Sequence, residues 1–185
     1  MGNRRKVRQK TLIIWIAVLV VTLILYYVKR DLFDISFLRE HVGDHRVPVI
    51  FLYLIILTFI GLTVIPSTPF AIAGVILFPP ATAYIINLIG IITSSLVVYY
   101  FTKYLRLDVW LDSKYPSKIE KIKNALNKKE LPIIAGWSFI PVVPTDLIIY
   151  VSSTLNIPFW KCVIGVMIGE GTLNAFYIFS IDFFL

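Results

Sequence analysis

Long apolar runs separated by short polar segments dominate the pattern of this chain. Four of them contain at most one charged residue: Thr11–Val28, Val47–Ile65, Ala81–Phe101 and Cys162–Ile181. Each reaches the roughly 17–25 residues that a helix needs to cross a bilayer core. The apolar positions form blocks instead of a single stripe, so they predict membrane helices and not the surface helices of a soluble domain.

The composition agrees with one membrane domain. Of the 185 residues, 58% are hydrophobic and 16% are charged, whereas soluble domains average about 45–50% and 25%. The segments between the runs are too short to bury a core of their own. Cys162 is the only cysteine, which excludes an internal disulfide and fits no metal-ligand spacing.

Residues 1–46 predict a basic cytoplasmic N-terminus, a transmembrane anchor and an outer loop. Five of the first ten residues are basic, as expected on the cytoplasmic side of a membrane. The run Thr11–Val28 is longer than the 7–15 apolar residues of a signal peptide, and no small-residue cleavage site follows it. We therefore interpret it as a retained anchor that places Lys29–Arg46 outside.

A second basic segment, residues 102–130, holds eight lysines and arginines and predicts a cytoplasmic loop. Within it, Tyr115–Glu130 indicates an interfacial helix with Ile119, Ile122 and Leu126 on one face; a solvated loop is the alternative. In both cases the segment would lie against anionic lipid headgroups. Nucleic-acid binding would need basic and aromatic residues interleaved on a soluble surface, so it is not expected.

Two proline pairs interrupt the apolar regions 47–78 and 131–158. They are Pro66 with Pro69 and Pro141 with Pro144. Because proline removes a backbone donor and ends a helix, each pair predicts the tip of a re-entrant helical hairpin. The ten residues 131–140 are too few to cross a bilayer. For the first region, an ordinary span that is only kinked by its prolines is the alternative.

The chain resembles itself at an offset of 75 residues, which superposes both proline pairs as well as Gly61 on Gly136 and Gly90 on Gly165. Each half would contain a hairpin and then a spanning helix. The spanning helices are residues 81–101 and 162–181. Because one span separates the hairpins, they would enter from opposite sides, as in the inverted repeats of transporters. The predicted fold is an all-α polytopic membrane protein with this inverted repeat in residues 47–185, preceded by an N-terminal transmembrane helix.

Polar groups within the apolar regions are costly to insert and are therefore functional candidates. Asp146 follows the second proline pair, Glu170 lies in the last run, and Asn174 is one helical turn further on. With Ser67 and Thr68 of the first tip and the four prolines, they form the predicted transport path. The structural alternatives are a local helix cap for Asp146, an interhelical hydrogen bond for Glu170, and packing for Asn174.

Ser94 and Ser95 take the place of Gly169 and Glu170 in the first half, and packing between helices is the favoured interpretation for both. An enzyme is not predicted. Ser138 as a nucleophile would need a base such as histidine, and the only histidines, His41 and His45, are in the outer loop. No residue set matches a metal site or a cofactor-binding motif.

The segment Ile65–Gly74 resembles the first proline-pair motif of the DedA superfamily, also called the SNARE-associated Golgi protein or VTT-domain family. Ile140–Asp146 resembles the second motif, and Tyr99–Leu105 resembles an aromatic-x-x-x-Arg-x-Leu ending with Lys103 in place of the usual arginine. The resemblance covers about Val47–Ser180. It implies two opposed re-entrant hairpins with spanning helices, and movement of phospholipids or carrier-lipid phosphates between leaflets.

Two departures from that family pattern concern the substrate. One branch of the family has an acidic residue in the first hairpin, whereas Val47–Phe101 contains none. The family also tends to have an arginine where this chain has Ser138, so a buried cation for a phosphate headgroup is missing there. By analogy, the short chain favours the plasma membrane of a prokaryote.

The leading hypothesis is a lipid translocase or scramblase whose two hairpin tips form a polar notch for the headgroup. An ion- or proton-coupled carrier of a small solute, with Asp146 and Glu170 titrating, is the first alternative. A non-transporting membrane scaffold whose basic loop recruits partners is the second. The oligomeric state stays open, and a homo-oligomer is allowed.

Overall fold

The computed structural model describes residues 46–63, 65–126 and 128–184, together with residues 13, 17 and 20, which are helical. The predicted outer loop before Arg46, including His41 and His45, and the rest of the predicted anchor Thr11–Val28 lie outside the described residues. Within the described residues the secondary structure is entirely helical. The all-α fold class is thus confirmed.

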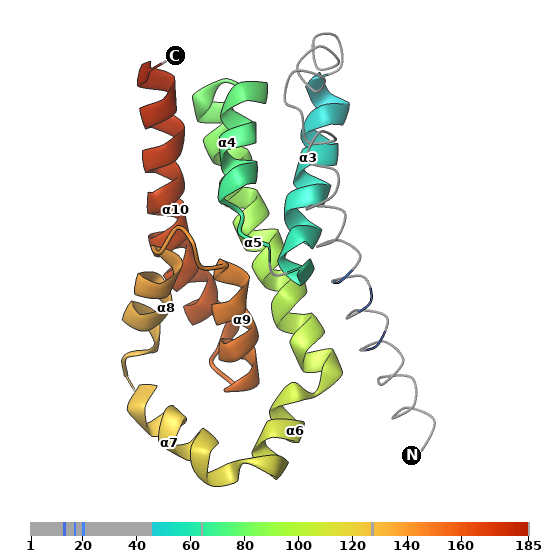
Figure 1. Cartoon of the computed structure of the whole chain (residues 1–185), viewed down its shortest axis with the longest axis vertical. Coiled ribbons are helices and arrows are strands. Elements are labelled where there is room, and N and C mark those ends of the chain that lie inside the picture. The colour runs from blue at the N-terminus through green and yellow to red at the C-terminus, as the bar shows by residue number, and fades with distance from the viewer. Residues whose placement is uncertain are drawn as a thin grey trace.

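The helices follow one another with short connections (Figure 1). In chain order they are α3 (Arg46–Ile60), the 3-10 turn η2 (Gly61–Thr63), α4 (Thr68–Leu77), α5 (Pro80–Leu105), α6 (Leu107–Lys114), α7 (Pro116–Leu126), α8 (Glu130–Ser138), α9 (Thr145–Thr154) and α10 (Phe159–Phe184).

Both proline pairs mark helix breaks, and the two members of a pair act differently. Pro66 and Pro141 lie in the breaks, where the chain is not helical. Pro69 falls in the first turn of α4, and Pro144 is the N-cap of α9. At a helix start the missing backbone N–H costs nothing, because that group has no helical acceptor. The first proline therefore helps to end one helix and the second helps to begin the next.

Two long helices cover the predicted spans and extend beyond them. Pro80–Leu105 and Phe159–Ser180 are long and apolar enough to cross a membrane, whereas Val47–Thr63 and Thr68–Leu77 are shorter apolar helices. α5 continues past the expected end at Phe101, and Arg106 closes it with a left-handed backbone (φ 56°). α5 and α10 both contain 26 residues, and α4 and α9 both contain ten.

The two short-helix pairs point in opposite directions (Figure 1). The turn between α3 and α4 points down, the turn between α8 and α9 points up, and both reach the middle of the molecule. α5 packs on α3, α4 and α9, while α10 packs on α8, α5 and α4. The long helices thus hold both pairs in place, and the breaks face one another between them.

Small residues let these helices approach closely. The side chain of Leu57 in α3 occupies the space that a β-carbon at Gly90 of α5 would need, and Ile134 of α8 does the same at Gly165 of α10. The 75-residue offset pairs these two glycines, and both serve as contact points. Gly136, the counterpart of Gly61 at that offset, has nothing within 4 Å of its would-be β-carbon, so this pair is not equivalent in packing.

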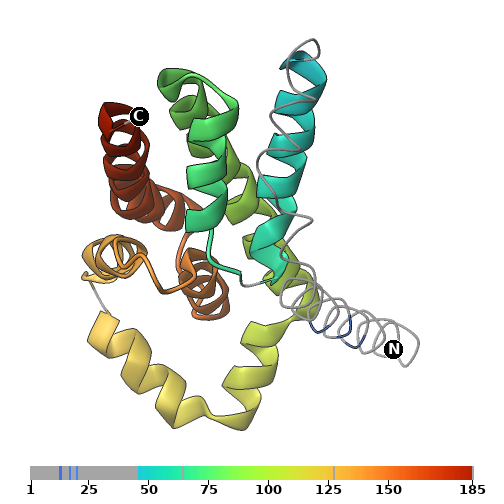
Figure 2. The same cartoon turned by 45° about the horizontal axis from the view of Figure 1, so that its top comes forward.

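The basic segment is helical, and a solvated loop is the wrong interpretation for it. α6 and α7 form an arc below the other helices (Figures 1 and 2). In α7, Ile119 is buried in the hydrophobic core and Leu126 packs against it, whereas Ile122 is exposed. Part of the predicted apolar face therefore packs against the protein core, and Ile122 remains exposed on the surface.

Candidate functional site

A small polar cavity lies where the two helix breaks meet. It has a volume of about 20 Å³, which is room for about one water molecule. Its polar lining comes from the first break, α5, α9 and α10: Ser67, Asn87, Ser94, Ser95, Thr145, Asp146 and Glu170. Leu57, Ile60, Gly90 and Ile91 complete the wall.

Glu170 is the deepest acidic group of this cavity. It lies in α10, is 5% exposed, and its carboxylate accepts a hydrogen bond of 2.5 Å from the Ser67 hydroxyl in the opposite break. Thr145 at the start of α9 lines the same cavity. A buried carboxylate needs such partners, because leaving it unpaired costs several kcal/mol. Glu170 therefore links the first helix break to α10.

Gly169 allows another helix to approach α10 closely next to Glu170. A β-carbon there would clash with the carbonyl oxygen of Ala135 and would lie 2.7 Å from the Ser138 Cβ atom. α8 thus lies directly on the glycine surface of α10. At Gly171 the nearest atom to a would-be β-carbon belongs to the Leu88 side chain, at 3.2 Å. Of the two glycines beside Glu170, only Gly169 is therefore approached closely by the backbone of another helix.

Asp146 is buried in the first turn of α9 and points to the other long helix. Its carboxylate accepts a hydrogen bond of 3.0 Å from the Ser94 hydroxyl in α5. The contact joins α9 to α5, whereas α9 begins without a side-chain capping hydrogen bond among the described residues. Gly61 makes room for this contact, because a β-carbon at that position would clash with Ser94 Oγ and Asp146 Oδ1.

The two breaks also touch directly. The Thr68 hydroxyl donates a hydrogen bond of 3.1 Å to the carbonyl oxygen of Pro141, and the Tyr150 hydroxyl lies 3.5 Å from the Leu62 carbonyl oxygen. Carbonyls at helix breaks lack helical donors, and the Thr68 hydroxyl supplies one to Pro141. Pro141 and Val142 are exposed at the rim, which leaves the outer edge of the contact accessible.

Most of the predicted path residues meet at this place. Ser67, Asp146 and Glu170 line the cavity, Thr68 bridges the tips, and the four prolines bound the two breaks. Asn174 is buried one turn beyond Glu170 but is not part of the described lining. Packing between helices was the favoured interpretation for Ser94 and Ser95, yet both line the cavity.

Sequence reasoning missed Asn87 and Thr145. Asn87 donates to the Ala83 carbonyl at 2.8 Å and lies 3.4 Å from the Tyr53 hydroxyl. The Tyr53 hydroxyl donates in turn to the Phe70 carbonyl at 2.5 Å, which ties α3 to α4. The only signal for Thr145 was its position beside Asp146. An asparagine in the middle of an apolar run was a signal that could have singled out Asn87.

The basic residues suggested by the family pattern are absent from the cavity or lie far from it. Ser138, at the position of the family arginine, is fully buried, and its hydroxyl has no hydrogen-bond partner in the described part of the chain. Lys103 is held at the end of α5 by Asp108, at 3.2 Å, and by Asn156. No lysine, arginine or histidine occurs among the described lining residues.

A comparison with known protein families identifies the family of this chain. The model of the VTT domain matches residues 65–183, from the first break to the end of α10. The chain belongs to the VTT-domain family. This family of DedA and SNARE-associated Golgi proteins consists of membrane proteins linked to membrane transport and is not known for enzymes. Searches of curated proteins and of solved structures found no match.

As a VTT-domain protein, the chain is a membrane protein, and its two long apolar helices fit that assignment. The family match includes Ser67, Asp146 and Glu170, so the polar cavity lies within the family domain. α3, by contrast, precedes the matched region although it supplies Leu57 and Ile60 to the cavity wall.

Proposed function

We propose that this protein moves lipids between the two leaflets of a membrane, with the headgroup passing the polar cavity and the acyl chains remaining in the bilayer. The observation that carries the proposal is the meeting of two helix breaks at a cavity that holds two carboxylates. Broken helices are tolerated at membrane depth only where they are buried in protein or line a wet cavity. A polar place of this kind inside a bilayer is what a headgroup needs in order to cross.

The helix lengths support re-entrant hairpins. α4 and α9 have ten residues each and α8 has nine, which corresponds to roughly 13–15 Å of helix. The hydrocarbon core is about 30 Å thick, so each of these helices reaches about halfway. α5 and α10, with 26 residues, extend over roughly 39 Å and are long enough to cross.

The equal lengths of corresponding helices support an inverted repeat. The ten-residue pair α4 and α9 and the 26-residue pair α5 and α10 follow breaks that point in opposite directions. The long helices begin at Pro80 and Phe159, 79 residues apart instead of 75, because the connections in the second half are longer. Two such units would give a headgroup equivalent routes to the cavity from either leaflet.

The outward faces of the long helices are apolar, as a lipid path requires. Large apolar side chains that are exposed on α5 and α10 include Ile85, Ile89, Leu96, Ile164, Ile168 and Phe176. An exposed apolar surface of this extent marks contact with lipid or another partner. Beside it, the rim residues Thr68 and Pro141 would let a headgroup reach the cavity from the lipid phase.

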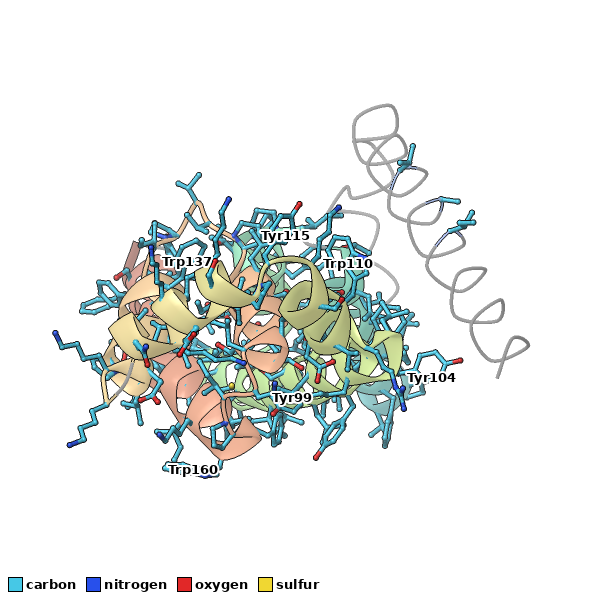
Figure 3. The ribbon with its side chains drawn as sticks, turned by 90° about the horizontal axis from the view of Figure 1, so that it is seen from below. Tyr99, Tyr104, Trp110, Tyr115, Trp137 and Trp160 are labelled. Atoms are coloured by element: carbon cyan, nitrogen blue, oxygen red, sulfur yellow. The ribbon has the colours of Figure 1, made fainter. Side chains whose placement is uncertain are left out.

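We place α6 and α7 on the cytoplasmic side of a prokaryotic plasma membrane, against anionic headgroups. The Lys114 ammonium lies 5.0 Å from the Trp110 ring and 5.4 Å from the Tyr115 ring, and Lys118 lies 5.5 Å from Tyr115. Figure 3 shows Trp110 and Tyr115 near each other at the edge of the molecule. Aromatic rings combined with lysines are typical of segments at the membrane interface.

An ion- or proton-coupled carrier is the second candidate, and the size of the cavity favours it. A volume of about 20 Å³ accepts an ion or a water molecule, whereas a headgroup would need the two tips to separate. Such a carrier would use the same carboxylates. A non-transporting scaffold, the third candidate, would leave the buried acids without a role beyond packing.

Reconstitution separates the three candidates. Purified protein in liposomes with an acyl-labelled phospholipid is treated with an external quencher that cannot cross the membrane. Lipid movement predicts loss of the inner-leaflet fluorescence that protein-free liposomes retain. Uptake of solute or an ion flux without loss of this fluorescence would point to a carrier, and the absence of both would leave a scaffold.

A further inference from the structure

The cavity contains two carboxyl groups and has no compensating cation in its described lining. Asp146 and Glu170 both face it, and they are close enough to interact electrostatically. Two like charges repel strongly in an environment of low dielectric constant. A cation between them would remove that repulsion, and each carboxylate would gain a partner of opposite charge.

Ser95 supplies an independent sign of a ligand. Its side chain lines the cavity, is 2% exposed, and has no hydrogen-bond partner among the described residues. The neighbouring hydroxyls of Ser67 and Ser94 differ, because each donates to a carboxylate. Buried hydroxyls are nearly always hydrogen-bonded, so the free oxygen of Ser95 is available to a group inside the cavity.

The size of the cavity limits what that group is. Room for about one water molecule suits an ammonium group or a small monovalent ion. A phosphate carries four oxygens around its phosphorus and would bring more negative charge beside the two acids. No arginine or lysine is present in the described lining to offset that charge.

We propose that this cavity binds a cationic group of about the size of a water molecule, which during lipid movement is the primary ammonium of an ethanolamine-type headgroup. An ammonium donates three hydrogen bonds, and Asp146, Glu170 and Ser95 provide three acceptors around the space. The ammonium source rests on the proposed lipid movement, whereas the cation site does not. A free alkali cation has the same charge and a similar size, so the experiment includes it.

The first arm of the experiment measures binding without transport. The melting temperature of the purified protein in an uncharged detergent is followed with ethanolammonium chloride, choline chloride, sodium chloride or sodium phosphate at equal ionic strength. Ethanolammonium is expected to raise it, because a ligand of the folded state stabilises by mass action. Glu170→Gln should lose this rise, and Glu120→Gln, which removes an exposed carboxylate of α7, should keep it.

Ser95→Ala provides a milder variant in case Glu170→Gln does not fold. Removing one hydrogen-bond acceptor should weaken the apparent affinity for ethanolammonium roughly fivefold. An unchanged affinity in this variant, or an equal rise in melting temperature with choline, would overturn the assignment of the cavity to a primary ammonium.

The second arm compares acyl-labelled ethanolamine, choline and glycerol phospholipids with unmodified headgroups in liposomes. The ethanolamine lipid should move roughly ten times faster than the anionic glycerol lipid, which corresponds to about 1.4 kcal/mol of discrimination. Equal rates for all three lipids, without stabilisation by ethanolammonium, would overturn the inference and leave lipid movement standing. Stabilisation without movement of any lipid would overturn the proposed function and leave the cation site. Equal stabilisation by sodium, with no lipid preference, would assign the site to a free ion.

Discussion

Ser67 and Glu170 lie 103 residues apart in the sequence, yet the serine hydroxyl donates a hydrogen bond of 2.5 Å to the glutamate carboxylate. This bond connects the first helix break to the last helix. It places the acid of α10 at the meeting point of the two hairpin tips, so the position of Glu170 depends on both halves of the chain.

Ser67→Ala is expected to destabilise the protein by about 1–3 kcal/mol, since it leaves a buried carboxylate with one donor fewer. The melting temperature in detergent measures this loss. Ser113→Ala is the matched control, because the Ser113 hydroxyl is exposed and bonds only to the Trp110 carbonyl of its own helix. An equal, small effect of both substitutions would show that the Ser67 bond contributes nothing.

Glu170→Gln and Asp146→Asn should insert and purify normally and should lose most of the transport activity. Each amide keeps the shape of the side chain and an oxygen that accepts from Ser67 or Ser94, but removes the charge. Activity in reconstituted liposomes is the measurement. Full activity of both variants would show that the two acids are structural, and failure of both to accumulate would favour the packing interpretation.

Gly61 and Gly136 provide a matched pair, because the 75-residue offset makes them equivalent while the structure does not. Gly61→Ala would force a methyl group onto Ser94 and Asp146 and should reduce both stability and activity. Gly136→Ala meets open space within α8 and should stabilise that helix by up to about 1 kcal/mol. The melting temperatures of the two variants should therefore move in opposite directions, and a loss at both positions would contradict the packing described around the cavity.

The pattern of the sequence was sufficient for the breaks and for the acidic groups. Charges are rare in membrane helices because they are costly there, and paired prolines break a helix, so Pro66, Pro141, Asp146 and Glu170 stand out without any knowledge of packing. The same reasoning predicted that they would meet, since the two hairpins were expected to oppose one another. The structure brings the two acids together in one cavity, and the two breaks meet through the hydrogen bond from Thr68 to Pro141.

The serine and threonine residues that line the cavity could not be identified from the sequence in this way. A serine or threonine in a helix can satisfy itself on the carbonyl four residues earlier, as Thr58 does with Leu54 and Thr102 with Val98. Such a residue therefore costs little free energy in an apolar run, and its presence there does not indicate a functional site. Which hydroxyl faces the cavity depends on how the helices pack. This is why packing between helices was favoured for Ser95 and why Thr145 was missed.

The orientation in the membrane can be tested with single cysteines in a Cys162→Ser background. Cys162 itself is fully buried, so replacing it removes a thiol that contributes no outward reactivity. Ala81 and Asn124 are exposed, and they lie near opposite ends of the molecule, at the start of α5 and in α7. A thiol reagent that cannot cross the membrane should label Ala81→Cys in intact cells and Asn124→Cys only after lysis. Labelling of both from outside would contradict the inverted repeat.

The lysines of α7 should bind anionic lipid. Lys118→Glu with Lys121→Glu replaces two exposed positive charges, each worth about 1 kcal/mol of attraction near an anionic surface. Activity of the variant in liposomes with anionic lipid should fall, and activity in neutral liposomes should stay unchanged. Lys103 is already held by Asp108 and Asn156, so Lys103→Gln is the control that should show no dependence on lipid charge. A lipid-independent loss in the α7 variant would indicate damage to folding instead.

The proline pairs test whether the breaks themselves are needed for lipid movement. Replacing Pro141 and Pro144 by alanine restores two backbone donors and should favour helix through the six residues that now separate α8 from α9. The carbonyl of Pro141, which accepts from Thr68, would then turn into the helix and the polar contact between the tips would be lost. We expect the double variant to insert normally and to move lipid much more slowly.

The two prolines of a pair have different roles, so their single variants should differ in activity. Pro144 and Pro69 begin helices that alanine also begins well, so Pro144→Ala alone should keep most of the activity, and Pro141→Ala alone should lose more. The corresponding variants of Pro66 and Pro69 should rank in the same order, because the proposed inverted repeat makes the two breaks equivalent. Fluorescent-lipid movement in liposomes measures the ranking. A Pro141→Ala, Pro144→Ala protein that moves lipid at the unmodified rate would remove the helix breaks from the mechanism.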